Sequence, residues 1–359
     1  MATKTDISTL GEFGLIRELT KGFENRNTST VRGIGDDAAV IGPIHAAVAG
    51  AKNPDAAATG ATEGEDHLLL TTDMLLEGVD FDLVYFPLKH LGYKAVVGGI
   101  NDIYAMNGTP RQITVSIGAS ARFAVEDLIE LYEGVRVACE EYGVDLVGGD
   151  TGASVNGLAI SVTALGTATH ARITYRNGAQ LNDLICITGD LGAAYMGLHL
   201  LEREKRALAG VDNPQPDFGG MEYLLERQLR PRARRDIIEA LEQADLVPTS
   251  MIDLSDGLAS DLLHICRSSS CGARIYLERI PIARQTYAMA EQLNADPVVA
   301  ALNGGDDHEL LFTVPLARQE EVARLGGVEI IGHIVRPEAG AALVTPDGSE
   351  IALTAPGHK

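Results

Sequence analysis

The chain has 359 residues, of which 45% are hydrophobic and 22% are charged, a balance typical of a folded globular protein rather than a disordered one. With 29 basic and 50 acidic side chains, it carries a net charge of −21. This charge disfavours binding to nucleic acid or to an anionic membrane surface, and no local basic patch is apparent in the sequence.

The sequence shows no membrane or export signal. No apolar run approaches the roughly 20 residues that span a bilayer, and the N-terminal charges Lys4, Asp6 and Glu12 leave no signal-peptide core. The four cysteines have the spacing of neither a zinc ribbon nor a disulfide framework. We therefore expect a cytoplasmic protein with reduced thiols.

The first elements lead to a group of polar residues. A helix is predicted over 11–24, and the turn Gly35-Asp36-Asp37 then leads into a strand that ends at Ile41. Residues 45–66 are rich in Ala, Gly and Asp without any period, which indicates a long loop. The strand predicted over 67–73 begins apolar and breaks into Thr71, Thr72 and Asp73.

Helices and strands alternate through the rest of the first half. Helix 89–106 contains Gly98-Gly99, which costs about 1 kcal/mol per glycine relative to alanine and calls for a packing reason. Helix 125–142 has a clear apolar stripe and a stop at Gly143. Strands are predicted over 113–117, 144–147 and 158–167.

The pattern breaks near 168–178, which predicts two domains, residues 1–168 and 169–359. The second half begins again with a strand over 184–188, a helix to about 206 and helical stretches that end near 244. A strand over 250–253, a helix to 267 and a strand over 310–314 follow. The predicted fold class is α/β, with helices and sheets in layers.

Four predicted turns share one composition, in which glycine or hydroxyl residues accompany aspartate. They are Gly35–Asp37, Thr71–Asp73, Gly148–Asp150 and Asp253–Asp256, and Asp102 adds a carboxylate from a helix. Gly-Asp is ordinary turn chemistry when it occurs alone. Mg²⁺ prefers hard oxygen ligands that it shares with phosphates, and strand ends are where ligands gather in open α/β folds. Together the turns therefore predict a magnesium and phosphate site.

Common nucleotide-binding signatures are missing from the sequence. It contains no Gly-x-x-x-x-Gly-Lys-Ser/Thr loop, no protein-kinase motif set and no Gly-x-Gly-x-x-Gly that opens a helix. A phosphoryl-transfer enzyme without a phosphate-loop lysine must rely on bound metal ions to neutralise a triphosphate.

Seven segments, in order along the chain, resemble the thiamine-monophosphate kinase family of the aminoimidazole-ribonucleotide synthetase-like superfamily. They are residues 33–40 (Gly-Ile-Gly-Asp-Asp-Ala-Ala-Val), 71–81, 101–108, 148–151, 188–192, 252–258 (Ile-Asp-Leu-Ser-Asp-Gly-Leu) and 304–313. The resemblance implies ATP-dependent phosphorylation of thiamine phosphate to thiamine diphosphate with Mg²⁺. It also implies an N-terminal domain that pairs in a homodimer, a C-terminal α/β domain, and ATP in a cleft between them.

The resemblance also implies roles for individual residues. Those matching Mg²⁺ ligands are Asp37, Thr71, Thr72, Asp73, Asp102, Asp150, Asp253 and Asp256. Those matching ATP contacts are Gly149, Asp150, Arg176, Ser255 and Tyr132. Asp80 and Asp306 match positions that meet thiamine phosphate. No side-chain nucleophile is implied, so the acceptor phosphate attacks ATP directly and the protein aligns the reactants.

Several motif positions depart from the family pattern. The family usually has His at the position of Asp80, Ser at Asn101, Thr at Gly152 and Gly-Glu-Asp-Tyr at residues 305–308. At position 80 a hydrogen-bond donor to phosphate becomes an acceptor of the wrong charge. Two alternatives therefore remain: a superfamily relative that phosphorylates another acceptor, and an ATP-binding protein that has lost catalysis.

Overall fold

The computed structural model describes residues 29–42, 66–210 and 218–355, with isolated positions at 14, 16, 17, 20, 27 and 216. The helix predicted over 11–24 therefore lies largely outside the described residues, as does the loop predicted over 45–66 apart from its last residue. Among the described helices, none has the length and apolar character needed to cross a membrane.

The first half of the described chain builds a six-stranded sheet with the order β1-β2-β3-β6-β4-β5. Its strands are β1 (Thr30–Arg32), β2 (Ala39–Ile41), β3 (Asp66–Leu76), β4 (Thr109–Ala119), β5 (Asp145–Ala153) and β6 (Leu158–Thr169). Neighbouring strands are antiparallel except for β4 and β5, which are parallel.

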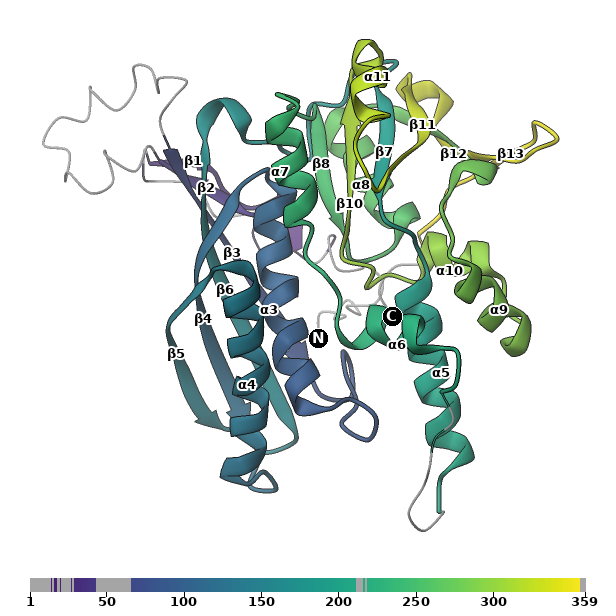
Figure 1. Ribbon diagram of the computed structural model, residues 1–359. Helices are drawn as coiled ribbons and strands as arrows, with labels where there is room; N and C mark the ends of the chain where they lie inside the picture. Colours follow the sequence, from purple (N-terminus) through teal and green to yellow (C-terminus); the bar gives the residue numbers. More distant parts are fainter. Residues whose placement is uncertain are drawn as a thin grey trace, which may run out of the picture.

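Two long helices, α3 (Leu88–Ala105) and α4 (Val125–Tyr142), cover one face of this sheet (Figure 1). They pack closely because glycines face the opposite backbone. A Cβ on Gly92 would lie 2.0 Å from the carbonyl oxygen of Leu131, and one on Gly134 would lie 1.8 Å from that of Lys89. Helix α4 has the predicted bounds, and Gly143 ends it in the left-handed conformation with φ 68°.

Two strands run further than the sequence predicted. β3, predicted over 67–73, continues to Leu76, because β6 pairs with it along its full length, from Asp66 opposite Thr169 to Leu76 opposite Ala159. β5 likewise includes the segment 148–152, which pairs with β4. The prediction that these two segments form turns at strand ends is therefore wrong.

The second half forms a seven-stranded sheet, within the described residues, with the order β13-β12-β9-β11-β7-β10-β8. Its strands are β7 (Leu184–Thr188), β8 (Ser250–Leu254), β9 (Gly272–Tyr276), β10 (Glu309–Val314), β11 (Val328–Val335), β12 (Ala341–Val344) and β13 (Glu350–Ala352). Its helices are α5 (Ala193–Ala207), α6 (Glu222–Leu229), α7 (Arg235–Gln243), α8 (Leu258–Ser269), α9 (Arg284–Leu293), α10 (Pro297–Asn303) and α11 (Gln319–Val322).

The two halves share one apolar core. Buried side chains of α3 and the first sheet, such as Ile100 and Ile113, belong to the same cluster as Met251 of β8 and Phe312 of β10. Helix α3 therefore lies between the two sheets (Figure 1). Lys94 of this helix pairs with Asp306, which lies in the segment between α10 and β10.

Candidate active site

Three carboxylates meet at the seam between the two halves. Asp37 comes from the turn before β2, Asp102 from the C-terminal part of α3, and Asp253 from β8. One oxygen of each lies within 4.8 Å of the other two, and Asp37 and Asp253 are buried. Residues distant in sequence thus form one acidic cluster, as the sequence predicted for these three aspartates.

The cluster is electrostatically unfavourable without a cation. Burial, followed by the neighbouring Asp253 and Asp37, raises the pKa of Asp102 well above its ordinary value. Burial, followed by Asp37, raises the pKa of Asp253 to about 8. The Oδ2 atom of Asp37 is buried and has no hydrogen-bond partner among the described residues. Such crowded hard oxygens fit a magnesium ion.

Arg176 is the cation beside this cluster. Its Nη2 donates to Oδ1 of Asp37, and its backbone N–H donates to Oδ1 of Asp36 at 3.1 Å. Burial alone would lower the pKa of Arg176, but Asp37 outweighs this effect and raises it. The guanidinium is therefore permanently charged and fixed in position, as a group that binds phosphate needs to be.

Alternation along β3 separates the two threonines. Thr71 donates from Oγ1 to Oδ2 of Asp102 at 2.7 Å, which places it at the cluster, and Asp73 lies on the same face of the strand. Thr72 lies on the opposite, exposed face, where it accepts a hydrogen bond from Thr163 at 3.1 Å. The structure therefore does not bring the Thr72 side chain to the acidic cluster.

The turn between β8 and α8 adds further carboxylates. Asp256 lies near enough to raise the pKa of Asp253, although burial and Asp37 act more strongly. Asp261, which the sequence analysis did not single out, accepts the backbone N–H groups of Asp256 and Gly257 at 3.2 Å each. It thereby fixes the turn that holds Ser255, an exposed residue.

Three predicted ATP contacts lie elsewhere in the chain. Gly149 and Asp150 are on the exposed edge strand β5, separated from β3 by β4 and β6. Gly149 also has a structural role, because a Cβ there would lie 1.9 Å from the carbonyl oxygen of Val115. Tyr132 follows Leu131, which contacts the start of α3 at Gly92, so about 15 Å of helix separates it from Asp102.

The two predicted acceptor residues differ in their surroundings. Asp80 is exposed and accepts the backbone N–H of Leu76 at 2.7 Å, which closes the turn after β3. Asp306 lies beside two cationic or polar groups, Lys94 and His308. Burial would raise the pKa of Asp306, but Lys94 and His308 outweigh it and hold that pKa below its ordinary value.

Comparison with known proteins places this geometry in a family. Residues 35–168 match the family model of AIR synthase related protein, N-terminal domain. The thiamine-monophosphate kinase of Aquifex aeolicus is 32% identical over 89% of this chain and 92% of its own length. The enzyme of the same name from Bacillus subtilis is 28% identical over 97% of this chain and 99% of its own.

The chain belongs to the thiamine-monophosphate kinase family. A solved structure of AaThiL complexed with AMPPCP and TMP has the same fold, with a TM-score of 0.79, 29% identity and coverage of 98% of this chain and 97% of that one. The resemblance inferred from the seven segments, and the layered α/β fold expected from it, are thereby confirmed.

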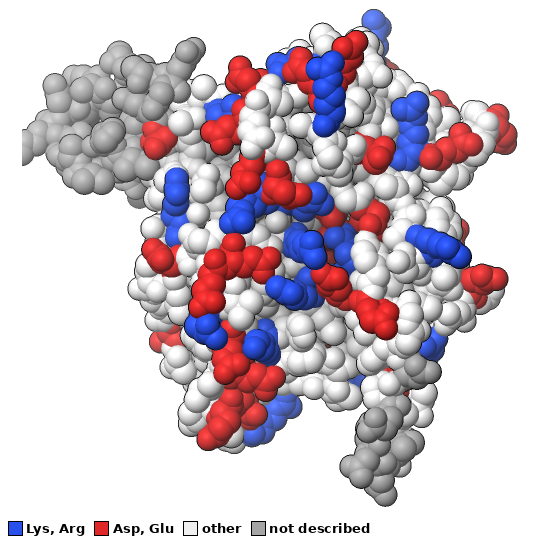
Figure 2. Space-filling model, in the orientation of Figure 1, with Lys and Arg blue, Asp and Glu red and all other residues white. Residues whose placement is uncertain are grey.

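The chain carries a cluster of arginine side chains that the sequence analysis did not single out. Figure 2 shows Lys and Arg gathered near the centre of one face, beside acidic groups. A hollow of about 500 Å³ is lined by Arg227, Arg230, Arg232, Arg234 and Arg235 among other residues. Five arginines within nine residues were a visible signal in the sequence. Each of these arginines pairs with an acidic residue, so the patch has little net charge.

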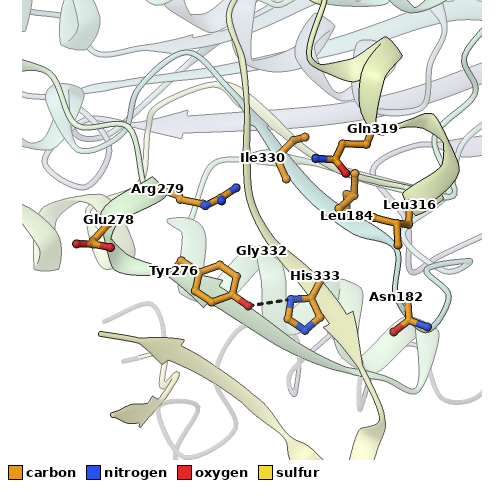
Figure 3. Close-up of a pocket in the computed structure, with 10 residues that line it drawn as sticks. All are labelled: Asn182, Leu184, Tyr276, Glu278, Arg279, Leu316, Gln319, Ile330, Gly332 and His333. Carbon is orange, nitrogen blue, oxygen red and sulfur yellow. Dashed lines mark hydrogen bonds between the residues drawn. The ribbon is translucent and has the colours of Figure 1, made fainter. Parts of the chain in front are cut away.

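A second hollow, of about 530 Å³, lies on the second sheet (Figure 3). The rings of Tyr276 and His333 stack there, and the tyrosine hydroxyl lies 3.3 Å from Nδ1 of His333. None of the residues that the family resemblance assigns to metal, ATP or acceptor lines this hollow. The candidate active site is therefore the acidic seam and not this hollow.

Proposed function

We propose that this chain transfers the γ-phosphoryl group of ATP to thiamine phosphate and so forms thiamine diphosphate. The observation that carries the proposal is the convergence of Asp37, Asp102 and Asp253 beside Arg176, in a chain of the thiamine-monophosphate kinase family. The related AaThiL has been solved in complex with AMPPCP and TMP, which supports the same pair of ligands for this chain.

We assign Mg²⁺ to the acidic seam. The buried, unpartnered oxygen of Asp37 and the raised pKa of Asp253, caused by burial and then by Asp37, fit a cation site. Asp37, Asp102 and Asp253 would hold the ion, with Asp73 and Asp256 close by and Thr71 fixing Asp102. When bound, Mg²⁺ would neutralise phosphate oxygens and favour the developing charge of phosphoryl transfer.

The protein residues align the two substrates. Arg176 would bind phosphate oxygens of ATP through its fixed guanidinium, and the exposed Ser255 would contact the nucleotide from the turn after β8. An oxygen of the acceptor phosphate then bonds to the γ-phosphorus while the bond between the γ-phosphorus and the β,γ-bridging oxygen breaks, so ADP leaves. Asp80 and Asp306 are proposed to meet the acceptor.

We further propose that the protein acts as a homodimer through the first sheet. No described element covers the face opposite α3 and α4, where Met74 of β3 is 60% exposed, and on the edge strand Val147 is 59% exposed. Gly149 and Asp150 lie on that same edge strand, so their proposed role at ATP would require a site shared with a second copy. The domain division 1–168 and 169–359 stays part of this proposal.

Sedimentation of the Met74→Glu variant tests the dimer. A charge in the centre of the interface should convert a dimer to a monomer. Val155→Glu is the matched control, because Val155 is 95% exposed in the turn after β5. A variant Met74→Glu that sediments like the wild type would contradict this interface.

We also place the protein in the cytoplasm, which its four free cysteines support.

The activity is tested by incubating protein, ATP and Mg²⁺ with thiamine phosphate and measuring thiamine diphosphate. Formation of the product supports the proposal, and its absence at high enzyme concentration contradicts it. ADP release with another acceptor would instead support a relative with different specificity. Calorimetric binding of ATP and Mg²⁺ without turnover of any acceptor would indicate lost catalysis.

A further inference from the structure

Lys94 is a buried lysine that the proposed chemistry does not yet use. It lies on α3, is 4% exposed, and forms an ion pair with Oδ2 of Asp306. Its Nζ also donates to the backbone oxygen of Gln228 at 3.1 Å and lies 5.6 Å from the ring centre of Phe86. A buried ammonium is costly unless it is paired, so Lys94 and Asp306 depend on each other.

The loop that carries Asp306 has a strained backbone. Asp306 and His308 both adopt positive φ, 64° and 52°, and Gly305 has φ 72°. Such a conformation costs a non-glycine residue about 1–3 kcal/mol and is found where the surrounding structure enforces it, often at functional sites. Here the backbone N–H of Asp306 donates to the oxygen of Ser255 at 2.8 Å, and that of His308 donates to Leu254 at 3.0 Å.

His308 supports the same carboxylate from the other side. Its side chain is 9% exposed, and Nε2 lies 3.2 Å from Oδ1 of Asp306, within ion-pair distance but without the geometry of a hydrogen bond. Gly98 of α3 leaves room for this arrangement, because a Cβ there would lie 2.8 Å from Oδ2 of Asp73 and 3.7 Å from Cε1 of His308. This close packing explains why a glycine occupies position 98, although glycine lowers the stability of a helix.

The Lys94–Asp306 pair is asymmetric. The lysine side chain is 5% exposed, whereas that of Asp306 is 39% exposed. The exposed edge of the carboxylate is the part of this pair that a ligand can reach. Together with the strained backbone, this asymmetry indicates that the carboxylate is held for a ligand.

We propose that Lys94 is a positioning residue for acceptor recognition, which with His308 holds the open edge of the Asp306 carboxylate toward the acceptor. The inference rests on the proposed function and deepens it. That carboxylate edge can accept a hydrogen bond from an N–H group, and thiamine phosphate carries an amino group on its pyrimidine ring. Because Asp306 has one methylene fewer than the glutamate usual in the family, its position depends more on these two supports.

The test combines calorimetric binding of thiamine phosphate with steady-state kinetics. Lys94→Met removes the charge and keeps an unbranched side chain that is one heavy atom shorter. We expect its Kd and KM for thiamine phosphate to rise at least about tenfold, while KM for ATP changes by less than about twofold. Lys94→Arg should recover part of the loss. Lys89→Met is the matched control, because Lys89 lies on the same helix in an exposed pair with Glu133.

Asp306→Asn and the double variant Lys94→Met/Asp306→Asn complete a double-mutant cycle. If Lys94 acts through Asp306, the double variant should bind thiamine phosphate no more weakly than Asp306→Asn alone. The neutral double variant and Lys94→Arg also provide the test if Lys94→Met fails to fold. A lower melting temperature of Lys94→Met with unchanged affinity for thiamine phosphate would overturn the inference, and so would equal losses for ATP and thiamine phosphate.

The wild-type protein separates this inference from the proposed function. Binding of thiamine phosphate without turnover would contradict the proposed function. The affinities of the wild type and Lys94→Met for thiamine phosphate would still test the inference. If the wild type turns over thiamine phosphate and Lys94→Met has the same Kd and KM for it, the inference alone is contradicted. Failure of the wild type to bind thiamine phosphate at all would overturn both.

Discussion

At Asp102, burial and three neighbouring carboxylates, Asp253, Asp37 and Asp73, raise the pKa, and the hydrogen bond from Thr71 opposes them. Asp102 therefore destabilises the metal-free protein, which indicates that the residue has a functional role. An asparagine could still accept the hydrogen bond of Thr71, so the fold should tolerate Asp102→Asn.

We predict that Asp102→Asn lowers kcat/KM for thiamine phosphate by at least about a hundredfold, because a proposed ligand for Mg²⁺ is lost. The same change should leave the metal-free protein as stable as the wild type or more so, since it relieves repulsion. Kinetics and thermal unfolding check the two effects. Asp66→Asn, at the exposed start of β3, is the control and should change neither.

Asp80 gives a second prediction at this scale. Its carboxylate is exposed, lies near enough to Asp73 to raise the pKa of that residue, though burial contributes more, and has the same sign of charge as a phosphate. We expect Asp80→His to lower KM for thiamine phosphate several-fold and to cost about 1 kcal/mol of stability, because the hydrogen bond to Leu76 is lost. An unchanged or higher KM would show that position 80 does not face the acceptor phosphate.

At the scale of elements, Glu309 joins three segments at the start of β10. It is 1% exposed and accepts hydrogen bonds from Arg227 of α6 at 2.8 Å and from Arg234, before α7, at 2.5 Å. Thr188 at the end of β7 donates to it as well. Two arginines thus share one buried carboxylate between α6, α7 and the second sheet.

We predict that Glu309→Gln lowers the free energy of unfolding by about 1.5–3 kcal/mol, because it removes the charge that the two guanidinium groups share and leaves Arg227 only Asp307 and Arg234 only Asp236 as carboxylate partners. Glu226→Gln is the matched control: its pair with Arg232 is exposed, so the expected loss is below about 1 kcal/mol. Urea denaturation measures both. Equal losses in the two variants would mean that the buried network adds no stability.

The sequence predicted the helices of the first half well and its strands less well. The apolar stripe and Gly143 were enough to bound α4, whereas β3 and β5 exceeded their apolar runs because pairing with β6 and β4 extends them. The continued strand also put Thr71 and Thr72 on opposite faces, which a turn would not have done. Helices α9 and α10 were not predicted at all.

The convergence of three aspartates was predictable because each lies in a segment that resembles the family. Asp37, Asp102 and Asp253 were expected together and lie together. Lys94 was missed because its partner, Asp306, is more than two hundred positions away and only the packing of α3 on the second half joins them. A sequence pattern shows which residues share an element, but pairs between elements depend on the tertiary structure.

At the scale of the whole molecule, the acidic seam couples stability to pH and to metal. The pKa of Asp253 is raised to about 8 in the folded chain by burial and by Asp37, whereas an unfolded aspartate titrates near pH 4. Between these values the folded state keeps a proton that the unfolded state has lost. The stability that this proton supplies is complete at low pH and is lost as pH rises toward about 8.

We therefore predict that the metal-free protein becomes less stable as pH rises from about 5 to about 8, and that Mg²⁺ raises the melting temperature more at the upper pH than at the lower. Burial also raises the pKa of Asp307 to about 7, which adds a pH dependence of the same sign outside the cluster. The difference between the melting curves with and without Mg²⁺ isolates the contribution of the seam, because the ion replaces only the protons of its own ligands. Asp253→Asn should reduce this difference at the upper pH, and a shift with Mg²⁺ that is equal or larger at the lower pH would contradict a metal site at Asp37, Asp102 and Asp253.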